Sequence, residues 1–315
     1  MKKIKKILLF THEKYLKNKE IQKITSFLKR NKVVVELVFQ SDLGIEIISS
    51  GDVIKNTTSI KKSTLKSYEL IIVFGGDGLF LSASKIAYTL EIPILGVNFG
   101  KIGFLVDVDK KDILQKISEI ITGNFLIDKR MLLDAKVTNT KMKTLKSTSL
   151  NDVVIHNYGL LRMIQMKIFI NDYLVNIQRS DGIIISTPTG STAYSMSNGC
   201  SIVSPDANVI SIVPVSAHTY SHRPIIVNSK DKITIEVEKK SIKNTLVTFD
   251  GHNNLNVAHP KRIDIKKSSK TLMIMHPSDY NYFKILNKKL KWGGRLNILF
   301  FIFVIFVQTI AANTK

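Results

Sequence analysis

The sequence feature that most constrains the fold is an apolar run that ends in a glycine-rich turn. Leu70–Phe74 are apolar without interruption, and Gly75-Gly76-Asp77-Gly78 follows directly. From Leu79 to Leu90, apolar residues recur at helical spacing. A strand that is apolar on both faces and leads into a helix is typical of a parallel sheet covered on both sides. The first third of the chain is therefore expected to be an α/β unit.

The rest of the chain divides into two patterns. In the first, strands at 7–10, 33–39 and 94–97 alternate with helices at 14–30 and 110–122. After about residue 125, long helical patterns are absent and short strand patterns take over, at 164–170, 173–177, 182–186, 209–215, 232–238 and 272–275. This second pattern predicts an all-β domain of antiparallel strands. Residues 279–290 again have a helical pattern.

The length supports a division into two domains, at roughly 100–200 residues per domain. We expect an α/β domain over residues 1–125 that carries the Gly-Gly-Asp-Gly turn, and a β-rich domain over 126–276. A C-terminal helix is expected over 277–296, and an apolar tail over 297–315.

A buried strand, a glycine-rich turn and a helix together form a phosphate-binding arrangement. Glycines let the backbone approach an anion, and the helix N-terminus offers unpaired N–H groups with partial positive charge. Gly75 and Gly76 are thus phosphate-binding candidates. Asp77 would repel phosphate, so it is better interpreted as a base, a metal ligand or an acceptor for a hydroxyl group. The alternative is a structural turn, because Asp-Gly is a common turn dipeptide.

A second glycine-containing turn, Asn98–Leu105, follows the next strand. Turns after adjacent parallel strands lie at the same edge of a sheet, where ligands collect in open α/β folds. We therefore expect the two turns to meet. Lys101 is a candidate phosphate contact or a plain surface residue, and two unrelated loops remain the alternative.

In the β region, Arg179–Ser197 is dense in hydroxyl groups and contains Gly190 and Tyr194. Small residues and hydroxyls allow close hydrogen bonding to a sugar or an amide. The alternative is a Ser/Thr-rich loop between two strands. The chain contains neither a Gly-x-Ser-x-Gly nucleophile elbow nor a Gly-x-x-x-x-Gly-Lys-[Ser/Thr] P-loop, which excludes those two enzyme classes.

Together these segments resemble the NAD kinase family. Gly75–Gly78 looks like the family signature, Asn98–Leu105 like its second loop, Asn151-Asp152 like its Asn-Glu pair and Arg179–Ser197 like its longest signature. The resemblance runs from about residue 4 to 296. It implies transfer of the ATP γ-phosphate to the 2′-hydroxyl of the adenosine ribose of NAD, with a divalent metal, Mg²⁺, as cofactor.

The resemblance also implies a fold and a set of site residues. The fold would be a Rossmann-like α/β domain of the diacylglycerol kinase and phosphofructokinase type, an all-β C-terminal domain, and a final helix that returns to the first domain. Asp77 would be catalytic. The expected NAD contacts are Asp77, Gly78, Asn151, Asp152, Arg162, Arg179, Asp181, Thr192, Ala193, Tyr194, Ser195, Met196, Ser197 and His252.

Two positions depart from the family pattern. Asp152 stands in place of the commoner glutamate, and His252 in place of a glutamine. Both keep hydrogen-bonding capacity, so we expect them to affect affinity or cofactor choice more than the reaction.

The formal net charge of +21 suggests anionic partners, but the lysines are scattered along the chain and no aromatic cluster accompanies them. A nucleic-acid-binding protein is therefore not favoured, and the expected partners are NAD, ATP and further copies of the chain in a dimer or tetramer. The single cysteine fits a reducing compartment, so a cytoplasmic location is expected.

The strongest rival interpretation is a lipid kinase of the diacylglycerol kinase type, which also carries a Gly-Gly-Asp-Gly turn. The tail over 297–315 and the basic residues before it would suit a membrane substrate, whereas Arg179–Ser197 favours a dinucleotide. The apolar run in the tail is shorter than the roughly 20 residues of a spanning helix. We expect an extension without a role, and a short helix in an oligomer contact or a weak membrane anchor are the alternatives.

Overall fold

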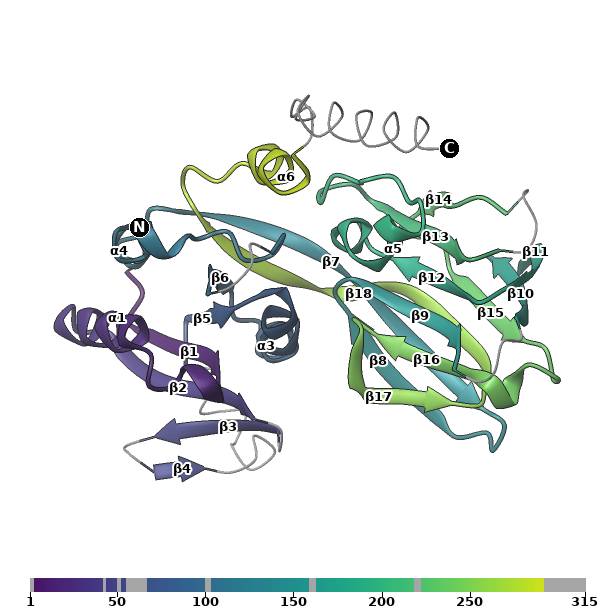
Figure 1. Ribbon diagram of the computed structural model, residues 1–315, viewed down its shortest axis with the longest axis horizontal. Coiled ribbons are helices and arrows are strands. Elements are labelled where there is room, and N and C mark those ends of the chain that lie inside the picture. Colours follow the sequence, from purple (N-terminus) through teal and green to yellow (C-terminus); the bar gives the residue numbers. More distant parts are fainter. Residues whose placement is uncertain are drawn as a thin grey trace, which may run out of the picture.

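The computed structural model describes residues 3–41, 44–49, 52–54, 67–99, 103–158, 163–217 and 222–291, with the backbone alone described at 41, 44–49, 52–54, 110 and 252–256. An α/β half and a β-rich half lie side by side, and two long strands run between them (Figure 1). Residues 3–41 and the segment around β5 (Leu70–Gly75) and β6 (Ile94–Asn98) lie in the α/β half, whereas residues after about 140 build most of the other half.

Four parallel strands form the centre of the α/β half, in the order β2-β1-β5-β6. Their bounds are β1 Lys6–His12, β2 Val34–Ser41, β5 Leu70–Gly75 and β6 Ile94–Asn98. Every residue of β5 and β6 is buried, as expected for strands covered on both faces. The predicted parallel sheet is confirmed. Two antiparallel strands that the sequence did not predict, β3 (Gly44–Ser49) and β4 (Asp52–Ile54), extend it beyond β2.

Helices cover both faces of this sheet. The side chains of α3 (Asp77–Leu90) pack with Leu8, Phe10, Ile71 and Val73 on one face. Those of α1 (Lys19–Arg30) and α4 (Ile113–Ile121) pack with the alternate strand residues on the other face. Helix α1 begins later than its apolar pattern suggests, because the Asn18 side chain accepts a hydrogen bond from the Glu20 N–H at 2.8 Å and caps the helix there.

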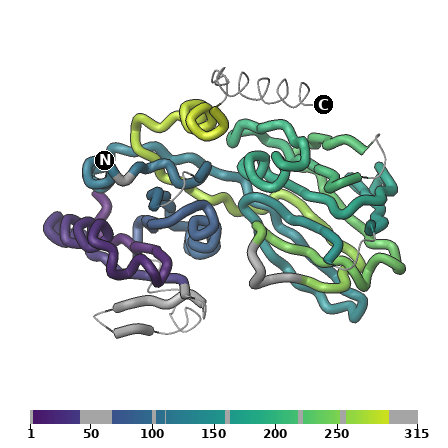
Figure 2. Tube along the Cα trace, in the orientation of Figure 1, coloured from purple at the N-terminus to yellow at the C-terminus, as the bar shows by residue number. Residues whose placement is uncertain are grey.

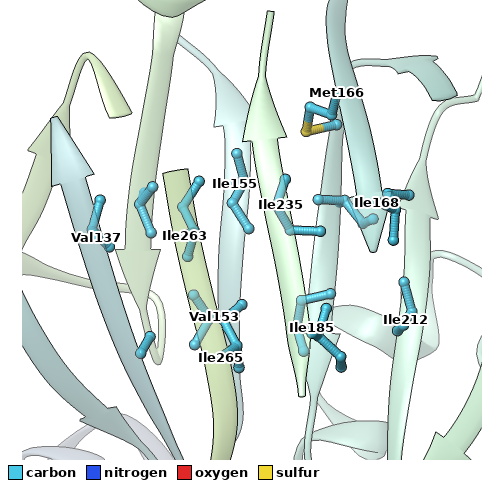
Figure 3. Packing of buried hydrophobic residues seen from close by; sticks show 14 of the residues in the cluster. Val137, Val153, Ile155, Met166, Ile168, Ile185, Ile212, Ile235, Ile263 and Ile265 are labelled. Atoms are coloured by element: carbon cyan, nitrogen blue, oxygen red, sulfur yellow. The ribbon is translucent and has the colours of Figure 1, made fainter. Parts of the chain in front are cut away.

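The β-rich half is a sandwich of two antiparallel layers. One layer is a six-stranded sheet in the order β14-β13-β12-β9-β16-β17, and the other contains β11, β10, β15, β18, β7 and β8. Isoleucines and valines from both layers point toward one another and exclude water between them (Figure 3). The bounds are β8 Thr144–Ser149, β9 Asp152–Asn157, β10 Ile164–Ile170, β11 Tyr173–Ser180, β12 Gly182–Ser186, β13 Val209–Val215, β14 Ile225–Asn228, β15 Ile233–Val237, β16 Thr245–Phe249 and β17 His252–Ala258.

Two long antiparallel strands join the halves. Strand β7 (Phe125–Asn139) pairs with β18 (Pro260–Pro277), and the end of β18 also pairs with β6, at Ile274 and Ile94. The same strand pair therefore closes the parallel sheet at one end and forms part of the sandwich at the other (Figure 1). The division into domains at residue 125 stays a proposal, because these strands belong to both halves.

The last described helix, α6 (Tyr282–Leu290), begins at Asn281, whose side chain accepts from the Lys284 N–H at 3.0 Å. Lys288 of this helix forms an ion pair with Asp109, after β6, at 3.3 Å. The final helix thus returns to the α/β half, as expected, and Figure 2 shows this yellow segment lying across the top of the molecule. No helix within the described residues is long and apolar enough to span a membrane. The tail at 297–315 lies outside the described residues.

Candidate active site

The Gly-Gly-Asp-Gly turn has the predicted strand-turn-helix form. Strand β5 ends at Gly75, Gly76 is the extended N-cap residue, and Asp77 is the first residue of α3. A Cβ built at Gly76 would meet no atom of the described residues within 4 Å, so among these residues the space over the turn leaves room for a ligand. The N–H groups of the first helical turn face the same end of the helix, which suits an anion.

The second glycine turn holds the Asp77 carboxylate. One carboxylate oxygen accepts from the Phe104 N–H at 2.7 Å and the other from the Leu105 N–H at 3.1 Å. A Cβ at Gly103 would lie 1.7 Å from Oδ1 of Asp77, so only glycine fits there. The two turns therefore meet at the same sheet edge, as predicted. Each carboxylate oxygen keeps a lone pair for a further donor, such as a substrate hydroxyl.

In the β-rich half, a buried aspartate fixes the Asn151-Asp152 turn. The Asp250 carboxylate accepts from the backbone N–H groups of Leu150 at 3.0 Å, Asn151 at 2.7 Å and Asp152 at 3.2 Å. Asp250 follows β16 with a φ of 53° and is 5% exposed. Sequence reasoning had not assigned it to the site. The sequence feature that could have pointed to Asp250 is the Asp250-Gly251 pair at a strand end, because the Asp77 turn contains the same dipeptide.

The hydroxyl-rich loop packs directly on that turn. The Thr187 hydroxyl donates to the Leu150 carbonyl at 2.6 Å and accepts from the Gly190 N–H at 3.1 Å. A Cβ at Gly190 would lie 2.1 Å from the Asn151 carbonyl oxygen, so glycine permits this close contact. The short helix α5 (Tyr194–Ser197) follows and places Tyr194, which is 48% exposed, at the surface.

A cavity of about 660 Å³ lies between these elements. Five of the predicted NAD contacts line it, together with Leu81 of α3, one helical turn beyond Asp77. Those five are Asn151, Asp152, Asp181, Ala193 and Tyr194. Asp250 and Gly251 line it as well. The cavity therefore combines carboxylates, the amides of Asn151 and Asn157, and the rings of Tyr194 and His156, a set suited to sugar hydroxyls and a base.

Models of two protein domains match the chain in the order of its two halves. The ATP-NAD kinase N-terminal domain matches residues 5–125, and the ATP-NAD kinase C-terminal domain matches residues 150–276. The chain belongs to the ATP-NAD kinase family.

Individual family members confirm the match. The NAD kinase of Cellvibrio japonicus is 42% identical over 228 residues, which cover 72% of this chain and 76% of that protein. The NAD kinase of Colwellia psychrerythraea is 36% identical over 279 residues, which cover 88% of this chain and 92% of that protein. These matches favour the NAD kinase interpretation over the lipid kinase.

Solved structures of this kinase family share the fold. Yeast NADH kinase complexed with NADH superposes with a TM-score of 0.78 at 19% identity, over 94% of this chain and 90% of that chain. An NAD kinase from Archaeoglobus fulgidus in complex with ATP superposes with a TM-score of 0.69 at 22% identity, over 91% of this chain and 98% of that chain. At these identities the likeness establishes the architecture, and the predicted architecture is thereby confirmed.

Among the residues whose side chains the structure describes, the other predicted contacts of this kinase do not line the cavity. Thr192 lies just before α5, whereas Ser195, Met196 and Ser197 belong to it, and Ser195 is fully buried. Arg179 is exposed on β11. Lys101 and Arg162 lie outside the described residues, and for His252 only the backbone, at the start of β17, is described. Their roles stay predictions.

Another cavity, of about 760 Å³, lies at the C-terminal end of α3. Tyr88, Thr89 and residues of β7, β8 and β18 line it, including Lys136, Lys146 and Lys270. It contains none of the predicted site residues. The cavity of about 660 Å³ is the candidate substrate site of the kinase, because it adjoins the Asn151-Asp152 turn and the hydroxyl-rich loop.

A buried polar network joins the hydroxyl-rich loop of the kinase to the second glycine turn. Arg130 of β7 donates to Thr189 at 3.2 Å and binds Asp128 at 2.7 Å. His276 of β18 is 2.8 Å from Asp107, which follows the turn, and its Nε2 lies 3.8 Å from Asp128. Burial lowers the pKa of His276, but the carboxylates of Asp107 and Asp128 outweigh it, so that the net shift of the pKa is upward.

The ionisation of Asp152 gives a testable pH dependence. Burial, aided by the nearby Asp250 carboxylate, raises the pKa of Asp152 to about 7. A folded-state pKa above the unfolded value disfavours the charged form, so stability is present at low pH and falls as pH rises through about 4 to 7. The whole decline is about 4 kcal/mol, of which about 3 kcal/mol falls above pH 5. Asp152→Asn should remove this upper part, which urea unfolding at pH 5 and pH 8 measures.

The control for this experiment is Asp172→Asn, because the Asp172 side chain is 79% exposed. We expect the control to retain the wild-type difference between pH 5 and pH 8. Equal differences in the wild type and in Asp152→Asn would contradict the assigned ionisation.

Proposed function

We propose that this chain is a kinase that transfers the γ-phosphate of ATP to the 2′-hydroxyl of the adenosine ribose of NAD and so makes NADP. The observation that carries the proposal is the cavity beside the Asn151-Asp152 turn, which also touches α3 one turn beyond Asp77. Membership of the ATP-NAD kinase family supports the same reaction.

Each half would have a separate task. The cavity in the β-rich half would bind NAD, with Asn151 and Asp152 holding ribose hydroxyls and Tyr194 packing on a ring. The turn at Gly75 and Gly76 would hold the phosphates of ATP. Asp77 would accept a hydrogen bond from the 2′-hydroxyl, orient it and take its proton late in the transfer.

We also propose that the reaction requires Mg²⁺. Within the described residues, no group of three or more histidine, cysteine or acidic side chains forms a metal site. Mg²⁺ commonly binds through one or two carboxylates plus substrate phosphates, and the Asp77 carboxylate at the open turn fits that mode. When bound, the ion would neutralise phosphate charge, while Asp77 orients the acceptor hydroxyl.

The test is direct synthesis of NADP. The purified protein with Mg²⁺ and ATP should convert NAD to NADP, detected with an NADP-specific dehydrogenase. Parallel reactions with NADH and with diacylglycerol define the acceptor. Phosphorylation of diacylglycerol without NADP formation would overturn the proposal in favour of the lipid kinase.

We propose that the protein forms homo-oligomers in the cytoplasm. Strands β11 and β14 stand at the ends of their sheets among the described strands, and both expose apolar side chains, including Tyr173, Leu174 and Ile226. Exposed apolar edge strands favour contact with another chain. The free, buried Cys200 is compatible with a reducing compartment. Analytical ultracentrifugation should show a dimer or a tetramer.

A further inference from the structure

The last helix brings positive charge to the Asp77 turn. Helix α6 lies against the α/β half, where Lys288 forms an exposed surface ion pair with Asp109, a kind of contact that contributes little to stability. Asp279, just before the helix, pairs with Lys116 of α4 at 2.9 Å. The next residue of α6, Lys289, is directed elsewhere. Its Nζ lies 4.3 Å from the centroid of the Phe104 ring.

Phe104 connects this lysine to the catalytic aspartate. The Phe104 N–H donates to the Asp77 carboxylate at 2.7 Å, so Lys289 lies over a residue that binds Asp77 directly. Asp77 is also the carboxylate that interacts electrostatically with the Lys289 ammonium. Within the described residues, Lys289 has no salt bridge, in contrast to Lys116 and Lys288. The ammonium is therefore not neutralised by a bonded carboxylate.

The surroundings of Lys289 disfavour an unpaired charge. The side chain is half-buried, and burial lowers its pKa to about 8 although the Asp77 carboxylate acts in the opposite direction. Lys288, the preceding residue of α6, is paired with Asp109 after β6. A desolvated cation beside an open, phosphate-binding turn gains most when an anionic ligand arrives.

We propose that Lys289 is a catalytic residue that contacts the phosphoryl group as it passes from ATP to the acceptor. This inference rests on the proposed function. In the transfer, the bond between the γ-phosphorus and the β,γ-bridging oxygen breaks, and ADP leaves with the electron pair. A bond forms from the ribose 2′-oxygen to the γ-phosphorus, and Asp77 takes the hydroxyl proton. The Lys289 ammonium neutralises charge on the γ-phosphate oxygens throughout.

Three variants test the proposal. Lys289→Met should lower kcat/KM for ATP about 10- to 100-fold, the effect of one charge-assisted hydrogen bond. The KM for NAD should change less than about threefold, because the lysine is assigned to the donor. Lys289→Arg keeps the charge and should retain most of the activity. The matched control is Lys288→Met, which removes the same charge from the same helix and should leave kcat/KM unchanged.

Binding of ATP alone separates this proposal from the proposed function. Calorimetric titration should give a Kd for ATP about tenfold weaker in Lys289→Met than in the wild type or in Lys288→Met. If the wild type makes no NADP but this difference holds, the proposed function fails and the phosphate contact stands. Equal ATP affinity and equal kcat/KM in the wild type and Lys289→Met would overturn the proposal, and so would equal losses in Lys288→Met.

The pH dependence of kcat/KM for ATP distinguishes a lysine that contacts the phosphate from a lysine with a purely structural role. With a pKa of about 8 in the free enzyme, Lys289 loses its charge as pH rises, so kcat/KM for ATP should fall above pH 8. In Lys289→Arg the guanidinium stays charged, and this decline should disappear. An unchanged decline in Lys289→Arg would contradict the assignment.

Discussion

Asp77→Asn should lower kcat by roughly 10²- to 10⁴-fold, the usual effect of losing a positioned acid or base. The side-chain oxygen of asparagine can still accept a hydrogen bond from one of the two N–H groups, those of Phe104 and Leu105. Its amide nitrogen would then face the other N–H group, which it cannot accept from. The variant therefore loses both the negative charge and the fixed orientation of the acceptor. Steady-state NADP formation measures the effect, and near-normal turnover would refute the role of Asp77.

Two further variants separate charge from position. Asp109→Asn makes the same chemical change at a half-exposed residue shortly after the second glycine turn. It should leave kcat within about twofold of the wild type, as is usual for surface substitutions. Gly103→Ala keeps the Asp77 carboxylate but places a Cβ 1.7 Å from its oxygen. The carboxylate must then move, and we expect a loss of about 10²-fold from misplacement alone. Full activity in Gly103→Ala would show that the orientation of Asp77 is not required.

Asp250→Ala should destabilise the fold by about 3–5 kcal/mol, because it leaves three buried N–H groups without their acceptor. The groups belong to Leu150, Asn151 and Asp152 at the start of β9. Removing the Asp250 charge also relieves Asp152, which offsets part of the loss. Urea unfolding at pH 8 gives the change in free energy, and NAD affinity should weaken as the turn loosens.

The control for Asp250 is Asp172→Ala, which removes an exposed carboxylate 3.7 Å from Lys232. Both positions have a positive φ, 53° and 66°, so alanine adds similar backbone strain at each, and the control should cost only about 1–2 kcal/mol. Asp250→Asn keeps one acceptor oxygen and should fall between the wild type and Asp250→Ala. A loss below about 1 kcal/mol in Asp250→Ala would show that the three N–H groups find other acceptors.

Local patterns in the sequence were sufficient to predict the Asp77 turn. Its strand, glycines and helix are contiguous, and the second turn follows the adjacent strand, so chain order alone placed them at one sheet edge. The role of Asp250 was not predictable in this way, because its partners lie about 100 residues away. Lys289 lies still farther from Asp77 along the chain, and an ordinary lysine in a lysine-rich helix gives no local signal.

The full length of the two long strands was not predicted, for a different reason: residues 272–275 were predicted as a strand within β18, whereas β7 was not predicted. Strand β7 changes from partly exposed residues near Phe125 to a buried stretch around Leu132, because its two ends lie in different surroundings. Apolar and polar residues therefore do not alternate regularly along the whole of β7. In addition, Asp128 and Arg130 of the buried polar network interrupt its apolar pattern.

The course of β18 has a consequence for how the protein is made. Leu272 and Ile274 belong to the core of the α/β half, and Ile274 pairs with Ile94 at the edge of the parallel sheet. A ribosome must therefore synthesise most of the chain before the first half can complete its own sheet. Until then the part of the β6 edge around Ile94, beyond its bridge from Val97 to Val108, lacks its β18 partner and is open to other nascent chains. We infer that the two halves complete folding together, after translation has passed residue 277.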